Sequence, residues 1–245
     1  MSRSVRAVAL ALCLVAAAGV VAAVVFVAMP RPSVADRIAM LFPDSEDYDF
    51  TPPKPGTYRL PPLKAVPDGE VLDRKGEPQR LHDVFAGKVT LVSFVYFLCS
   101  DSNGCPLATS TLFDLFDASA ELPGFAKRVQ LVTISFDPKR DTPEAVDSFI
   151  YPVLVDPERD RKINWQAFTG RSEASLQPIL DRFGQVVDRR PDSDVINHLL
   201  RLYLIDEKGR VRNIYGLGMI DPRLILTDIE TLLMEEGTSV ARADL

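Results

Sequence analysis

The segment that most constrains the fold is an apolar run in the middle of the chain, residues 89–98. β-Branched and aromatic side chains dominate it, and its apolar and polar positions do not alternate as they do in a strand with one solvated face. The run therefore predicts a central strand covered on both faces, which is typical of α/β proteins. Residues 129–136 have the same character and predict a second buried strand.

The rest of this region alternates helices with strands and ends in a hairpin. Pro106 suits the first turn of a helix, and Thr142 with Pro143 suits an N-cap followed by the first helical position. Further elements are expected at residues 71–78 (a strand and turn), 81–85 and 175–183 (helices), 199–205 with 211–215 (a hairpin), and 221–234 (a helix). This order predicts an α/β, thioredoxin-like domain with a parallel pair of strands first and an antiparallel pair last.

Four parts are expected along the 245 residues: a membrane anchor or signal segment (1–29), a proline-rich linker (30–62), the thioredoxin-like domain (63–236) and a C-terminal tail (237–245). The linker contains eight prolines and has no sustained helical or strand period. It is therefore expected to be stiff and extended, as a spacer between the membrane and the domain.

The expected anchor is an uncharged stretch, residues 7–29, that follows Arg3 and Arg6. A helix of this length would extend about 35 Å, enough to cross a hydrocarbon core of about 30 Å. The two arginines predict a cytoplasmic N-terminus, so we expect a single-pass protein of a bacterial inner membrane with its domain facing the periplasm. A cleavable signal peptide is the alternative, because residues 33–35 look like a small-residue cleavage site.

Composition excludes several classes of function. Three cysteines and two histidines are too few for an all-cysteine zinc ribbon, an array of zinc fingers or a multi-cluster iron–sulfur protein. The net charge of −6, with no long block of Lys or Arg, argues against a nucleic-acid partner.

Two cysteines are expected at the edge of the sheet where α/β proteins bind ligands. Cys99 follows the predicted central strand, and Cys105 directly precedes Pro106. As the expected N-cap of the helix, Cys105 would lie near the positive end of the helix dipole, which favours its thiolate. The five residues between the cysteines permit a disulfide without requiring one, so a redox pair and a structural disulfide both remain open.

One histidine is expected near these cysteines. His198 precedes the strand predicted at 199–205, at the edge of the same sheet. A single histidine is usually a hydrogen-bonded structural residue, but two thiolates and one imidazole form a soft ligand set that suits copper, either Cu(I) or Cu(II). His82 has no such neighbours in the sequence and is expected to be a surface residue.

Residues 63–235 contain a set of short motifs: Gly87-Lys88, Cys105-Pro106, Ile134-Ser135-Phe136-Asp137-Pro138, Arg140-Asp141-Thr142-Pro143-Glu144, Trp165, Thr169-Gly170, and His198 with Tyr203-Leu204-Ile205-Asp206. With the expected anchor and proline-rich spacer, they make this region resemble the Sco/SenC family of membrane-anchored, thioredoxin-fold copper proteins. The segment containing Asp137-Pro138 and Arg140-Asp141-Thr142-Pro143-Glu144 is the most specific part of the resemblance.

The resemblance implies copper bound by Cys99, Cys105 and His198. It also implies delivery of copper to the binuclear site of cytochrome c oxidase, or reduction of the cysteines of that site, with the copper-bearing oxidase subunit or a similar copper client as partner. Asp137 is expected either near the metal, behind its ligands, or as a turn residue at the end of a strand. The family usually has three residues between its cysteines, and this chain has five. Asp101 lies in this longer loop, and we expect it either to join the metal site or to be exposed to solvent.

Two other functions remain open. The first is a periplasmic thiol–disulfide oxidoreductase that uses Cys99 and Cys105 alone, and the second is a membrane-tethered adaptor with an unused disulfide. Reducing thioredoxin-like proteins commonly carry a cis-proline where this chain has Leu200, whereas His198 lies two residues earlier. This favours a metal-transfer protein over a turnover enzyme, with thiol–disulfide exchange as a secondary activity.

Overall fold

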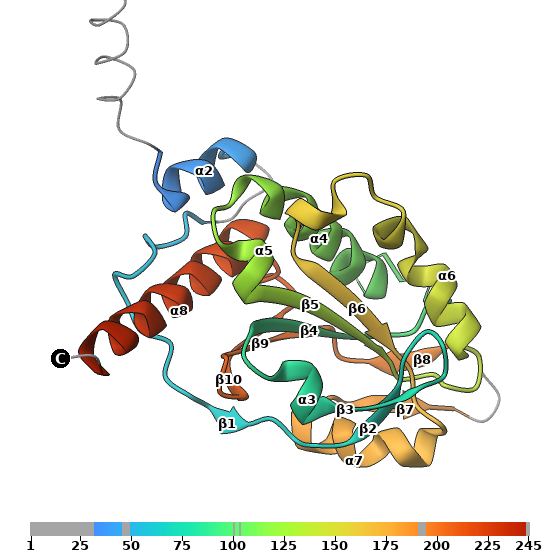
Figure 1. Ribbon diagram of the computed structural model, residues 1–245. Coiled ribbons are helices and arrows are strands. Elements are labelled where there is room, and N and C mark those ends of the chain that lie inside the picture. Colours follow the sequence, from blue (N-terminus) through green and yellow to red (C-terminus); the bar gives the residue numbers. More distant parts are fainter. Residues whose placement is uncertain (1–31, 46–49, 100, 103, 191–194, 244–245) are drawn as a thin grey trace, which may run out of the picture. The chain divides into compact units, whose positions relative to one another are not determined.

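The computed structural model describes residues 32–45, 50–99, 101–102, 104–190 and 195–243 (Figure 1). The anchor expected at residues 7–29 lies outside these residues. No helix within the described ranges is both long and apolar enough to cross a membrane.

A six-stranded sheet forms the centre of residues 34–245 (Figure 1), in the order β1-β10-β9-β4-β5-β6. Its strands are β1 (Lys64–Ala65), β4 (Val89–Val95), β5 (Val129–Ser135), β6 (Asn164–Phe168), β9 (Arg201–Ile205) and β10 (Arg210–Gly216). β4, β5 and β6 are parallel, whereas β9 pairs antiparallel with both β4 and β10. The predicted parallel pair and closing antiparallel hairpin are both present.

Two short hairpins lie outside this sheet. They are β2 (Glu70–Leu72) with β3 (Pro78–Arg80), and β7 (Val187–Arg189) with β8 (Ile196–His198). The sequence did not predict β6, β7 or β8. β7 and β8 are three residues each and only partly apolar, so local pattern does not distinguish them from loop.

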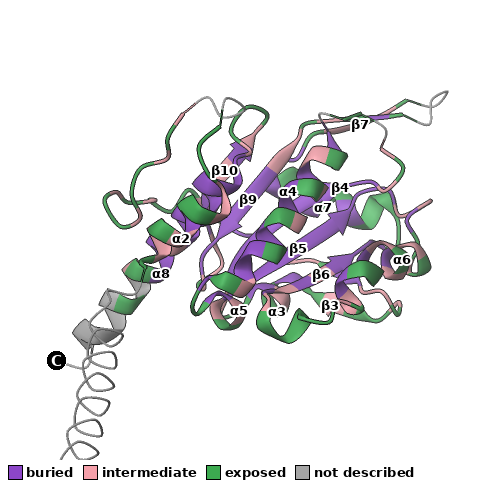
Figure 2. Cartoon of the chain, turned by 90° about the horizontal axis from the view of Figure 1, so that it is seen from above, coloured by how far each residue is buried: buried purple, intermediate pink, exposed green. Residues whose placement is uncertain are grey.

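The core is built on β4 and β5, in which every residue is buried. Figure 2 shows the buried strands enclosed by helices with exposed outer faces. Phe94 of β4 contacts Phe183 and Tyr203 edge to face, with ring centroids 5.0 and 5.7 Å apart. This burial confirms that the apolar run marks a central strand.

The helices are α2 (Val34–Leu41), α3 (Leu81–Phe85), α4 (Cys105–Ala118), α5 (Phe125–Arg128), α6 (Pro143–Leu154), α7 (Glu173–Phe183) and α8 (Pro222–Ala243). In Figure 1, α4 and α8 lie on one face of the sheet and α7 lies on the other. α6 begins as predicted, with Thr142 as N-cap and Pro143 in the first turn. α8 continues past the predicted end near residue 234.

The segment expected to be an extended spacer contains a helix and packs on the domain. α2 contacts α8, and its Ile38 is buried. Arg223 of α8 pairs with Asp44 at 2.6 Å and donates to the Phe50 carbonyl. The Tyr58 hydroxyl donates to the buried Asp228. These tertiary contacts explain why the segment is not a free, extended spacer. They cannot be read from the local sequence.

Candidate metal centre

The three predicted ligands come from three separate elements and meet at the carboxyl end of β4. Cys99 ends the turn after β4, where its amide donates to the Tyr96 carbonyl. Cys105 is the first residue of α4, and His198 is the last residue of β8. Their sulfur and nitrogen atoms all lie within 4.8 Å of one another. Among the described residues this is the only group of three or more Cys, His, Asp or Glu side chains that could hold a metal ion.

His198 is oriented by its backbone neighbour and by two aromatic rings. Its Nδ1 lies 3.1 Å from the Ile196 carbonyl oxygen, and because a carbonyl can only accept, Nδ1 carries the proton. Nε2 then presents its lone pair, 3.3 Å from the Cys105 sulfur. The imidazole also packs against Tyr96 and Phe136, with centroids 5.7 and 5.2 Å apart. The ring is therefore held with its metal-binding nitrogen toward the cysteines.

The burial of Cys105 opposes the thiolate that the sequence suggested. The helix begins at Cys105 itself and Gly104 is the N-cap, so the predicted N-cap was wrong by one residue. Burial raises the pKa of the Cys105 thiol well above its usual range, and the neighbouring Cys99 adds to this, although the Tyr96 amide 3.4 Å from the sulfur acts in the opposite direction. In this environment desolvation outweighs the helix dipole.

Cys99 is half-buried, and both cysteines are free thiols in the structure. Tyr96 lies beside it: burial raises the pKa of the Tyr96 hydroxyl, and a hydrogen bond with Cys99 raises it further. Tyr96 therefore contacts all three predicted ligands, through its amide, its hydroxyl and its ring.

Asp141 fixes the turn that carries Cys99, a role that the sequence reasoning missed. Its carboxylate accepts hydrogen bonds from the Phe97 amide at 3.0 Å and from the Ser135 hydroxyl, and the residue is 2% exposed. Burial raises the pKa of Asp141, although these two hydrogen bonds act in the opposite direction. The only signal in the sequence was the position of Asp141 within the Arg140–Glu144 motif.

Asp137 and Asp101 do not belong to the group of metal-binding atoms. The Asp137 carboxylate pairs with Arg140, and its carbonyl accepts from the Asp141 amide at 2.8 Å, as in a turn at the end of a strand. Arg140 in turn lies over the Tyr96 ring, 5.7 Å from its centroid. Asp137 is therefore connected to the predicted ligands only indirectly, because it pairs with Arg140 and Arg140 packs on Tyr96. Asp101 lines the cavity but remains exposed.

Two of the three predicted ligands, Cys99 and His198, line a cavity of about 440 Å³, whereas Cys105 is buried. The cavity is lined by Tyr96, Cys99, Asp101, Gly104, residues 195–201, Gly216 and Leu217. Two sulfurs and one imidazole, with no carboxylate among them, form a donor set that suits copper and is poorly suited to Mg²⁺ or Ca²⁺.

Comparison with known proteins gives concordant results. The SCO1/SenC family matches residues 65–234. The SCO2-like protein RP587 of Rickettsia prowazekii is 27% identical over 175 residues, which cover 65% of this chain and 75% of the relative.

Solved structures share the fold. A SCO1/SenC family lipoprotein from Bacillus anthracis is 26% identical, with a TM-score of 0.59, over 72% of this chain and 99% of that chain. ScoI from Bradyrhizobium japonicum, solved with copper bound, is 25% identical, with a TM-score of 0.51, over 69% of this chain and 99% of that chain. Because the family match spans most of the folded part of the chain, this protein belongs to the SCO1/SenC family.

Proposed function

We propose that this chain is a copper metallochaperone that binds copper through Cys99, Cys105 and His198. The observation that carries this proposal is the convergence of two free thiols and one oriented imidazole, with the Cys105 sulfur 3.3 Å from His198 Nε2. The proton on Nδ1 leaves Nε2 available as a ligand, and both cysteines supply soft sulfur donors.

Relatives support copper as the cargo. ScoI of Bradyrhizobium japonicum and ScoI of Arabidopsis thaliana were solved with copper bound. BsSco, which has the same fold, is described as a member of the Sco family of cytochrome c oxidase assembly proteins. We accordingly propose the copper-bearing subunit of cytochrome c oxidase as the client, which receives copper or has the cysteines of its binuclear site reduced.

The location proposed for this transfer is the periplasmic face of a bacterial inner membrane. The support is the uncharged stretch 7–29 behind Arg3 and Arg6, which would anchor the chain and leave the domain outside the cytoplasm. Carbonate-washed membranes should then retain the full-length protein, and protease added outside the inner membrane of intact spheroplasts should remove the domain. Recovery of a soluble periplasmic product that begins near residue 36 would show cleavage instead.

A thiol–disulfide oxidoreductase is the second candidate, because the two cysteines are free and their sulfurs lie within 4.8 Å of each other. In such an enzyme one thiolate attacks a substrate disulfide, and the second thiol resolves the mixed disulfide. That reaction needs no imidazole ligand. It therefore leaves the orientation of His198 toward Cys105 without a role.

The test uses cells that lack this chain and are complemented with the wild type, His198→Ala or Cys105→Ser. If the chain is a copper chaperone, both variants should lower the copper content of the oxidase, because each removes a ligand. If it is an oxidoreductase, Cys105→Ser should be inactive and His198→Ala nearly normal. Full oxidase copper in the His198→Ala cells would reject the chaperone function.

A further inference from the structure

Exposed apolar side chains are concentrated around the metal-binding cavity. Eleven large apolar side chains are exposed among the described residues. Five of these line the cavity or lie within two residues of a lining or ligand residue in sequence, and we name this group the apolar rim: Leu98, Val195, Leu199, Leu217 and Met219. Leu98 precedes Cys99, and Leu217 is 64% exposed.

The apolar rim is assembled by the fold and is not a single hydrophobic stretch of sequence. Its residues come from the turn after β4, from β8 and its flanks, and from the loop after β10. The cost of exposing apolar groups to water makes such clusters uncommon unless they bind something. Their convergence on the metal-binding cavity indicates a surface that is covered by a partner during function.

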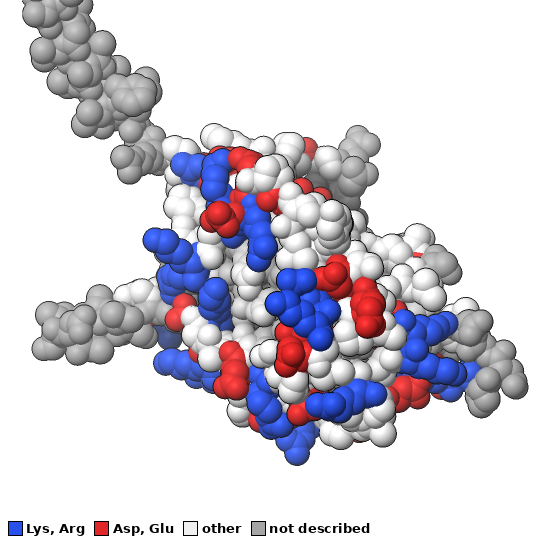
Figure 3. All heavy atoms as spheres, turned by 45° about the vertical axis from the view of Figure 1, so that its right-hand side comes forward, with Lys and Arg blue, Asp and Glu red and all other residues white. Residues whose placement is uncertain are grey.

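The charge of the cavity indicates the chemistry of that partner. Among the described residues that line it, Asp101 and Arg201 are the only two that carry a formal charge at neutral pH apart from the predicted ligands, and their charges are opposite. Charged side chains make up 25% of the chain, and Figure 3 shows Lys and Arg interspersed with Asp and Glu over one face. A cavity whose described lining has balanced charges, with an apolar rim, matches an apolar, uncharged surface rather than a charged one.

We propose that the apolar rim docks the protein that receives copper, and that this protein presents an uncharged apolar loop carrying its own thiol ligands. This inference rests on the proposed function and adds the surface by which the client is recognised. Because Cys99 and His198 line a cavity and Cys105 is buried, a recipient must insert side chains to reach the metal. A rim that seals against the inserted loop excludes water while the metal changes ligands.

The exposures of the two cysteines set the order of that ligand exchange. Cys99 is half-buried, whereas Cys105 is buried and accepts a hydrogen bond from the Tyr96 amide. A recipient thiol therefore displaces Cys99 first. The bond between copper and the Cys99 sulfur breaks as a bond to the recipient sulfur forms. The proton of the recipient thiol passes to Cys99, and the oxidation state of copper does not change.

The test measures copper transfer from the reduced, copper-loaded full-length protein under anaerobic conditions. The acceptors are the reduced, copper-free soluble domain of the copper-bearing oxidase subunit and, separately, a small copper chelator. The variants are Leu217→Lys and Met219→Lys in the apolar rim. The matched control is Leu63→Lys, which alters a leucine of similar exposure (56%) next to β1.

Both rim variants should slow transfer to the protein acceptor by about tenfold, as expected for a central apolar contact of an interface. Transfer to the chelator and transfer by Leu63→Lys should be unchanged. The wild-type rate should change less than about twofold between low and physiological salt, because docking without net charge is weakly screened.

Three results would overturn the proposal. Equal rates of copper transfer to the protein acceptor for Leu217→Lys and Leu63→Lys would show that the rim does not dock the recipient. The same conclusion would follow if the rim variants slowed transfer to the chelator as much as transfer to the protein. Loss of self-association or of vesicle binding in the rim variants, with transfer intact, would assign the rim to a second copy or to a membrane. A wild-type protein that binds no copper would instead refute the proposed function itself.

Discussion

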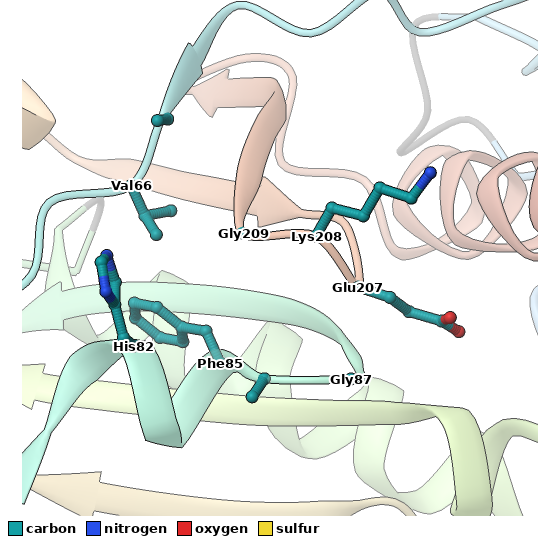
Figure 4. Close-up of a pocket in the computed structure, with 9 residues that line it drawn as sticks. Val66, His82, Phe85, Gly87, Glu207, Lys208 and Gly209 are labelled. Atoms are coloured by element: carbon teal, nitrogen blue, oxygen red, sulfur yellow. The ribbon is translucent and has the colours of Figure 1, made fainter.

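Two cavities of similar volume lie at opposite ends of β4, and each has one histidine in its lining. The cavity at the carboxyl end, about 440 Å³, has Cys99 and His198. The cavity at the amino end, about 410 Å³, has His82 (Figure 4). In Figure 4, His82 lies beside Phe85 and points toward Val66, while the Glu207 and Lys208 side chains extend away from it.

The comparison shows that convergence of ligands, rather than cavity size, distinguishes the metal centre. His198 is held by a carbonyl and two rings and faces a sulfur atom. His82 is exposed, and it belongs to no group of metal-binding side chains among the described residues.

The largest effect is expected from the cysteines. Oxidation of Cys99 and Cys105 to a disulfide should abolish copper binding, because a disulfide supplies no thiolate ligand. Cys105→Ser should have nearly the same effect. Equilibrium dialysis of the reduced and oxidised protein measures this, and Cys13→Ser is the control. Equal copper retention by both redox forms would remove the cysteines from the ligand set.

The two histidines should differ strongly when each is replaced by alanine. His198→Ala should weaken copper binding by more than about 100-fold. In typical metal sites, mutation of a residue that only orients a ligand already lowers metal affinity by about 10- to 100-fold, and this variant removes the ligand itself. His82→Ala should leave copper affinity unchanged. Competition with a chelator of known affinity measures both. Similar losses of copper affinity in the two variants would show that the two cavities do not differ in metal binding.

A smaller effect on copper is expected from Asp141. Asp141→Ala removes the acceptor of the Phe97 amide and should loosen the turn that carries Cys99, which lowers copper affinity by about tenfold. Asp141→Asn keeps an acceptor oxygen and should restore most of the affinity. If Asp141→Ala binds copper as tightly as the wild type, the turn does not depend on this carboxylate.

Near the other cavity, replacement of Asp206 should change stability and not copper affinity. Burial favours a raised pKa for Asp206, but hydrogen bonds from Arg210 and Arg212 outweigh it and hold the pKa below its usual value. Asp206→Asn should lower the free energy of unfolding by about 3 kcal/mol, because it leaves the buried Arg212 without one partner.

The pH dependence of stability follows from the sign of that shift. A lowered pKa means that the ionised carboxylate stabilises the fold at every pH above its unfolded pKa of about 3.9, and that this contribution is lost as the pH falls further. The free energy of unfolding of the wild type, measured with urea, should therefore fall more steeply below about pH 4 than that of Asp206→Asn. Parallel curves for the two proteins would contradict this assignment.

Much of the sheet could be predicted from sequence because its signals are local. The apolar run at residues 89–98 marks β4, and the turn residues 206–209 mark the hairpin of β9 and β10. Cys105-Pro106 located the start of α4 to within one residue. The packing of α2 and Tyr58 on α8 was not predictable, because Ile38 and Tyr58 gain their partners only in the folded chain.

The site was predictable in its ligand types but not in its environment. Sequence order placed Cys99, Cys105 and His198 at one edge of the sheet, and the structure brings their metal-binding atoms together. The sequence suggested a lowered pKa for Cys105, whereas burial, which depends on residues distant in sequence, raises it. The support from Asp141 was missed for the same reason.

The most direct measurement of the central claim is an anaerobic copper titration of the reduced wild-type protein, followed by X-ray absorption at the copper edge. A site made of Cys99, Cys105 and His198 predicts one copper per chain, with two sulfur scatterers and one imidazole, and loss of the imidazole signal in His198→Ala. A copper coordinated without sulfur, or an imidazole signal that persists in His198→Ala, would contradict it.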